Sequence, residues 1–137
     1  MTKVVINTED EFELSVRQIY EYLEIKGYTN IKFVISSTSN FNDTQEVLYE
    51  DLDEDWLCNS INDCYDTMEL IDIKYDNKTF NEWDLKRDDP ILIDVVNLYP
   101  NDIPNNKIIE IPDDVKWHIC CVDWGGEWIA ENHRTWR

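Results

Sequence analysis

The sequence is poor in glycine and proline and has no long apolar run. It contains three Gly and four Pro in 137 residues. So little glycine excludes the Gly-rich loops that hold phosphate groups, and no G-x-S-x-G nucleophile turn is present. No apolar stretch reaches the roughly 18 residues of a membrane span, so we expect no membrane association. The first ten residues lack a basic region followed by an apolar one, and we expect no signal peptide.

Basic residues are also scarce. Twelve Lys and Arg stand against 30 Asp and Glu, which gives a formal net charge of -18. This charge repels phosphate and predicts no direct binding of nucleic acid, whereas a basic surface attracts the chain over a Debye length of about 10 Å. A merely solvated acidic surface is the alternative. We expect a monomer, kept soluble by the same charge.

Cysteine and histidine are rare, with four Cys and two His. The cysteines stand at 58, 64, 120 and 121, which does not resemble a secreted disulfide framework. We therefore expect a cytoplasmic protein whose thiols are buried or bind metal. Cys58 and Cys64 would point to different sides of one helix, which favours core packing for Cys64.

Apolar residues make up 42% of the chain and include six Trp, seven Tyr and four Phe. A chain of this length suits one core, so we expect a single domain over residues 1–137.

Residue periodicity predicts an α+β fold, in which an N-terminal helix packs on a mainly antiparallel sheet. Thr8 and Glu11 form a possible capping box for a helix over 9–26, which Gly27 would end. A polar loop should follow the strand at 31–36, and a second short helix is predicted within 53–66. The predicted strands lie at 3–7, 31–36, 68–76, 91–97, 107–111 and 115–122. The sequence does not settle whether 77–90 holds a helix or a strand.

The C-terminal stretch predicts a β-hairpin, with Gly125 and Gly126 in a two-residue turn. In that register Cys120 faces Glu131, and His118 faces His133. Opposed β-carbons lie about 4.5–5.5 Å apart, so these side chains would share one face.

Two imidazoles and a thiolate suit zinc, and the predicted ligands are His118, Cys120 and His133, completed by Glu131 or another cysteine. We expect a structural ion, with ordinary packing of the histidines as the alternative. A Cys120–His133 catalytic dyad lacks a recognisable orienting residue and oxyanion donors, so we expect no enzyme.

An acidic run forms the second candidate site. It does not fit an EF-hand loop, because Trp56 stands where glycine is required and Asn62 where the bidentate Glu is required. A solvated face and a contact patch for a basic protein are the two interpretations. The residues predicted to bind a partner are Glu50, Asp51, Asp53, Glu54, Asp55, Asp63 and Asp66.

Small size, strong acidity and the ending VKWHICCVDWGGEWIAENHRTWR together resemble phage-encoded type II-A anti-CRISPR proteins. This resemblance implies an inhibitor of Cas9 that occupies a basic nucleic-acid groove inside the bacterial host cell. Because such inhibitors differ in fold, it implies no fold and assigns no residue.

Two other functions remain open. The chain could be an antitoxin or immunity-type inhibitor of a basic nuclease, which would use the same electrostatics. It could also be a small zinc-dependent enzyme centred on His118, Cys120 and His133.

Overall fold

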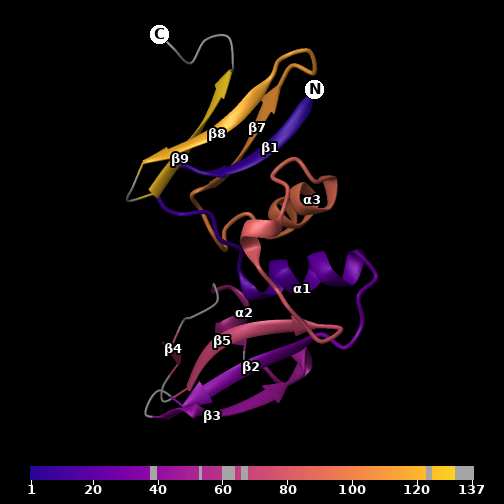
Figure 1. Ribbon diagram of the computed structural model, residues 1–137, viewed down its shortest axis with the longest axis vertical. Coiled ribbons are helices and arrows are strands. Elements are labelled where there is room, and N and C mark those ends of the chain that lie inside the picture. The colour runs from indigo at the N-terminus through magenta and orange to yellow at the C-terminus, as the bar shows by residue number, and fades with distance from the viewer. Residues whose placement is uncertain (38–39, 53, 60–63, 66–67, 123–124, 132–137) are drawn as a thin grey trace. The chain divides into compact units, whose positions relative to one another are not determined.

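The computed structural model describes residues 1–37, 40–52, 54–59, 64–65, 68–122 and 125–131 (Figure 1). The chain divides into two compact units, one formed by 1–13 and 84–137 and the other by 14–83. Every strand pair among the described residues is antiparallel, and helices accompany the sheets. The α+β prediction is therefore confirmed. The single domain over 1–137 stays a prediction.

The 14–83 unit is built on a sheet with the strand order β3-β2-β5-β4, and β6 pairs with β5. The strands are β2 (Lys32–Ser37), β3 (Asn40–Val47), β4 (Cys64–Tyr65), β5 (Met68–Tyr75) and β6 (Lys78–Thr79). Helix α1 (Val16–Ile25) lies over this sheet (Figure 1). Its Ile19 and Leu23 are buried, as are Phe33, Leu70 and Ile73 of the sheet.

Helix α1 begins later than predicted. Ser15 is its N-cap: the hydroxyl accepts from Gln18 N at 3.3 Å, and Gln18 Oε1 accepts from Ser15 N at 2.9 Å. The expected box at Thr8 and Glu11 is wrong, because Asn7 Oδ1 accepts from Glu9 N and Asp10 N and folds that segment into a turn. Gly27 ends the helix region at φ +91°, as predicted.

Two predictions between residues 36 and 66 are wrong. The polar loop contains strand β3, whose exposed Thr44, Gln45 and Glu46 suit a sheet edge that faces water. A single helix over 53–66 is wrong, because among the described residues of that range Glu54–Leu57 form α2, after the 3-10 helix η1 (Tyr49–Asp51), and Cys64–Tyr65 form β4. The 77–90 connection holds β6 and the 3-10 helix η2 (Glu82–Asp84).

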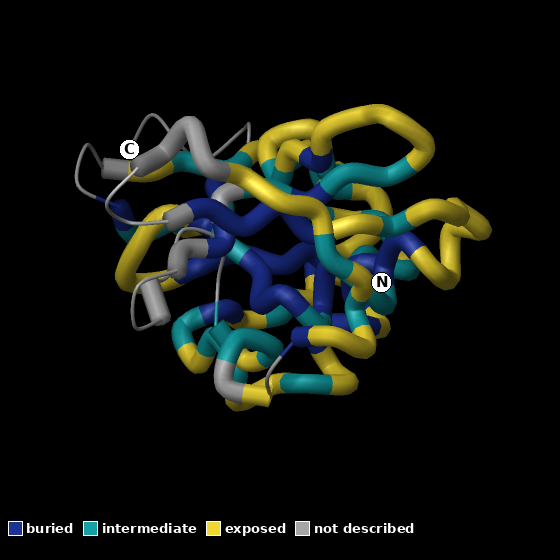
Figure 2. The backbone as a smooth tube through the Cα atoms, turned by 90° about the horizontal axis from the view of Figure 1, so that it is seen from below, coloured by how far each residue is buried: buried dark blue, intermediate teal, exposed yellow. Residues whose placement is uncertain are grey.

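The other unit contains β1 (Thr2–Asn7), α3 (Pro90–Leu98), β7 (Asn106–Ile111), β8 (Trp117–Val122) and β9 (Gly125–Glu131). β1 pairs with β7 and β8 pairs with β9. Val4, Ile6 and Ile111 form a buried cluster against which Trp117, Ile119 and Ile129 pack. Figure 2 marks the buried residues of the chain in dark blue and the exposed ones in yellow.

A buried ion pair joins the hairpin to the rest of its unit. Arg87 Nη1 and Nη2 donate to the two carboxylate oxygens of Glu127 at 2.7 and 2.8 Å, and the guanidinium lies 3.8 Å from the centroid of the Phe12 ring. Glu127 Oε1 also accepts from Asn7 N at 2.9 Å. The Arg87 and Glu127 side chains are 12% and 8% exposed, so this bidentate pair is shielded from water.

The predicted strand at 91–97 is helix α3. Asp89 caps this helix by accepting from Ile91 N at 2.9 Å, and Pro90 occupies the first turn, where its missing N–H costs nothing. Leu92, Ile93, Val95 and Val96 are buried at helical spacing. The Asp-Pro start and burial of one helix face outweigh the β-branched composition.

This cap gives a testable stability change. We expect Asp89→Ala to lower the free energy of unfolding by about 1 kcal/mol, because it leaves the Ile91 N–H without that acceptor. Urea denaturation measures the loss. Asp88→Ala removes the same charge from an exposed neighbour that does not cap the helix, and it should change stability by less than about 0.5 kcal/mol. Equal losses in both variants would contradict the capping role.

Candidate partner-binding surface

The described acids of the predicted patch lie on two short helical segments of the 14–83 unit. Glu50 and Asp51 belong to η1, and Glu54 begins α2. All three are exposed. The backbone of Asp55 lies in α2, while Asp53, Asp63 and Asp66 fall outside the described residues. Three of the seven predicted acids are therefore close in sequence, and the structure shows that all three are exposed to solvent.

A groove adjoins this acidic segment. The ring of Tyr49 in η1 stacks on the ring of Tyr20 in α1, with centroids 3.8 Å apart and planes inclined by 9°. The groove has a volume of about 280 Å³. Its walls include Tyr20, Glu24, Tyr28, Leu48, Tyr49 and Glu50, together with Lys32.

Negative charge gathers at this groove. Burial raises the pKa of the Tyr20 hydroxyl, and so do its hydrogen bond to the Glu24 carboxylate and the charges of Glu24, Glu50 and Glu21. Each carboxylate disfavours a phenolate beside it. The groove therefore has a negative potential, which favours a cation.

The Tyr20 hydroxyl can report this potential. We expect its pKa to lie above the ordinary 10.0 in the native chain and to fall toward that value in Glu24→Gln, which removes a charge. NMR titration of tyrosine labelled with ¹³C at Cζ measures each ring separately. Native stability should decrease as the pH rises above 10.0, because the unfolded chain then releases this proton more readily than the native one. An unchanged Tyr20 pKa in Glu24→Gln would contradict the arrangement.

Exposed apolar side chains lie in and beside the groove. Leu48 is 46% exposed and Tyr28 is 36% exposed, although both are large enough to fill a core position. Protein interfaces commonly combine an apolar or aromatic centre with a polar rim. Leu48, the Tyr20–Tyr49 pair, Glu24 and Glu50 provide that combination, and we name the groove that they line the tyrosine groove.

The sequence did not single out the tyrosine groove. The spacing of Tyr20 and Glu24 puts them on one face of a helix, so their proximity could have been predicted from the sequence. Contact between Tyr20 and Tyr49 depends on how η1 packs against α1. No sequence pattern fixed that packing, so the groove could not be found from the run of acids alone.

The predicted zinc ligands do not meet in the predicted register. His118 pairs with Ala130, and Cys120 pairs with Trp128. Glu131 pairs with Trp117 rather than with Cys120, and His133 lies outside the described residues. His118 is exposed and Cys120 is partly buried. Among the residues that the structure describes, no three His, Cys, Asp or Glu side chains are grouped to hold a metal.

The predicted hairpin register is wrong because Gly125 and Gly126 lie in strand β9 instead of forming the turn. Gly125 and Gly126 have φ of +102° and +81°, as predicted, but both belong to β9. A Cβ on Gly125 would lie 2.8 Å from Asp10 Cα, and Gly126 N donates to Asp10 O at 3.1 Å. The glycines thus allow close approach of two backbones. A structural zinc ion stays a prediction, without the shared face that motivated it.

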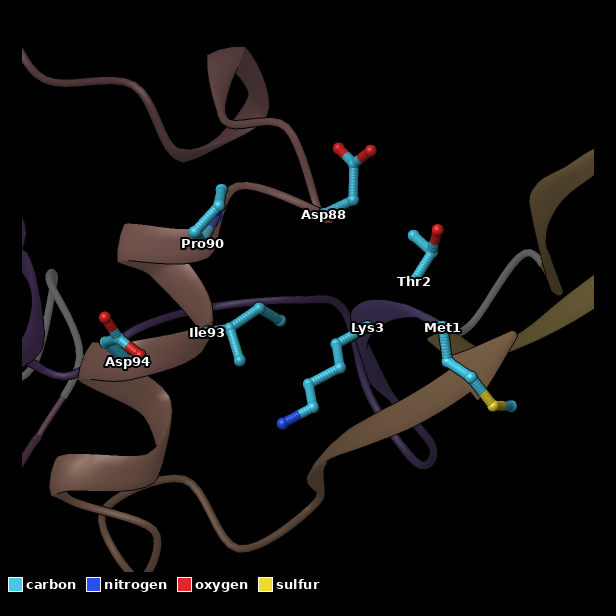
Figure 3. Close-up of a pocket in the computed structure, with 7 residues that line it drawn as sticks. All are labelled: Met1, Thr2, Lys3, Asp88, Pro90, Ile93 and Asp94. Carbon is cyan, nitrogen blue, oxygen red and sulfur yellow. The ribbon is translucent and has the colours of Figure 1, made fainter. Parts of the chain in front are cut away.

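A second, larger cavity lies in the unit that contains α3 (Figure 3). It measures about 440 Å³ and is open to solvent. Lys3 extends into it from β1, while Asp88 and Asp94 line it near α3. Charges of both signs therefore face the cavity, and its lining selects no ligand class. The tyrosine groove, with two carboxylates against one lysine, is the more selective site.

No helix among the described residues is both long and apolar enough to cross a membrane. No family model matches the chain, and searches of curated proteins and of solved structures likewise give no significant match.

Proposed function

We propose that this chain inhibits a bacterial defence nuclease by binding a basic surface that otherwise holds nucleic acid. The target class is that of the type II-A anti-CRISPR proteins, which the chain resembles and which act on Cas9. The proposed mechanism is competition: folded carboxylates occupy an Arg- and Lys-rich groove and block nucleic-acid loading in the cytoplasm of the bacterial host. No chemical step by this chain is required.

One observation supports this proposal most. Exposed Glu50 lines a groove together with the half-buried Tyr20–Tyr49 pair, and exposed Asp51 and Glu54 follow it in a chain of net charge -18. Long-range attraction supplies speed and orientation, and apolar contacts hold the complex after encounter. Acids alone would be consistent with a solvated face. The adjoining aromatic groove favours a binding surface.

Binding to purified proteins tests the proposal. The immobilised chain is exposed to guide-free Cas9, to guide-loaded Cas9 and to a small basic nuclease, first at about 0.05 M and then at about 0.5 M salt. We expect guide-free Cas9 to bind more tightly than the loaded form and to dissociate faster at high salt. Binding of the small nuclease alone would instead favour an immunity-type inhibitor. Binding of none of them would refute the proposal.

A further inference from the structure

The tyrosine groove combines an apolar wall with carboxylates in a small volume. Tyr20, Tyr28 and Tyr49 supply rings and Leu48 an aliphatic surface. Glu24 and Glu50 supply two negative charges, and Lys32 supplies one positive charge, so the lining has a net negative charge. At about 280 Å³ the groove is smaller than the roughly 300–1,000 Å³ pockets that hold drug-sized ligands. A single side chain of a partner suits this size better.

The lining favours a long cationic side chain. Its methylene stem would lie against Leu48 and the tyrosine rings, and its charged head would meet a carboxylate. A guanidinium is planar, weakly hydrated and able to donate two parallel hydrogen bonds to one carboxylate. It also stacks on aromatic faces, which a compact, strongly hydrated ammonium does less well. The groove therefore discriminates between the two basic side chains.

We infer that the tyrosine groove binds one arginine side chain of the basic partner. This inference rests on the proposed function, since it names the group that the surface recognises. The groove thereby anchors the complex, while exposed Asp51 and Glu54, which follow Glu50 in the chain, accelerate encounter. Arginine-rich surfaces are favoured over lysine-rich ones of equal charge.

Two short peptides test this inference without any partner protein. Acetyl-Gly-Arg-Gly-amide and acetyl-Gly-Lys-Gly-amide carry the same charge and are titrated into the full chain while the NMR signals of the tyrosine rings are followed. We expect saturable shifts at Tyr20 and Tyr49 and affinity about two- to fivefold higher for the arginine peptide, as a cation–π term of ~0.5–1 kcal/mol implies. Equal affinities, or unmoved Tyr20 and Tyr49 signals, would overturn the inference.

Substitutions locate the binding. Glu50→Gln should weaken arginine-peptide binding, whereas Glu54→Gln removes the same charge from an exposed acid that does not line the groove and should weaken it less. Tyr49→Leu should reduce the preference for arginine, because it removes one of the three rings that line the groove. Because Tyr49 is half-buried and could be needed for folding, Glu50→Gln serves as the decisive variant. Equal effects of Glu50→Gln and Glu54→Gln would contradict a groove-bound arginine.

The two hypotheses can fail separately. If the arginine peptide binds in the groove but no nucleic-acid-handling protein binds the chain, the site stands and the proposed function fails. If guide-free Cas9 binds and Glu50→Gln leaves its affinity unchanged, the function stands and the arginine site fails.

Discussion

Replacing Glu127 with alanine is expected to lower the free energy of unfolding by about 3–5 kcal/mol, the loss typical of a broken buried ion pair. The guanidinium of Arg87 is only 12% exposed as a side chain and would lose both hydrogen bonds to the carboxylate. Among the described residues it would keep a hydrogen bond to Val5 O at 3.3 Å and its contact with the Phe12 ring. Asn7 N would lose its acceptor as well. Equilibrium unfolding in urea measures the change.

Two control variants distinguish the loss of the ion pair from a nonspecific loss of stability. Glu110→Ala removes an exposed acid of β7 and should change stability by less than about 0.5 kcal/mol. The double variant Arg87→Met with Glu127→Leu removes both charges and should recover much of the loss, because buried pairs replaced by apolar groups are often neutral. A loss below about 1 kcal/mol in Glu127→Ala would show that the pair contributes little.

Reversing the charge of Glu50, Asp51 and Glu54 to lysine is expected to slow association with guide-free Cas9 by about tenfold or more at low salt. These acids are exposed, so their reversal should leave the melting temperature nearly unchanged. Association rates are measured by surface-immobilised binding over a salt series. The difference from the parent chain should shrink as salt screens the charges.

A matched variant controls for net charge. Reversal of Glu9, Glu110 and Asp114, which are exposed in the other compact unit, changes the formal charge by the same amount. It should slow association distinctly less than reversal at Glu50, Asp51 and Glu54. If both variants slow association equally, the acids of η1 and α2 have no special role and the charge acts as a whole.

Much of the α+β architecture could be predicted from local patterns. The alternating runs at 107–111 and 115–122 form β7 and β8, and the apolar stripe of α1 is buried as its spacing indicates. Where β-branched composition and helix-capping residues indicated different structures, the capping residues gave the correct prediction. At 91–97 the branched residues favoured a strand, whereas Asp89 and Pro90 start a helix.

Features that depend on distant residues could not be predicted. Arg87 and Glu127 are 40 residues apart, and neither lies in a pattern that indicates a buried pair. The hairpin register depends on the approach of Gly125 to Asp10, which no spacing rule describes. The candidate site shows the same limit: the sequence located exposed acids, but the stacking of Tyr20 on Tyr49 follows from tertiary packing.

Competition for nucleic-acid loading is the decisive measurement of whether this chain inhibits Cas9. Fluorescently labelled guide RNA is mixed with Cas9 and increasing amounts of the chain, and bound RNA is followed by anisotropy at low and at high salt. We expect the chain to reduce RNA binding in proportion to its concentration. High salt should weaken this inhibition, and reversal of Glu50, Asp51 and Glu54 should largely remove it. Undiminished RNA binding at a large excess of the chain, at low salt, would show that the chain does not block nucleic-acid loading.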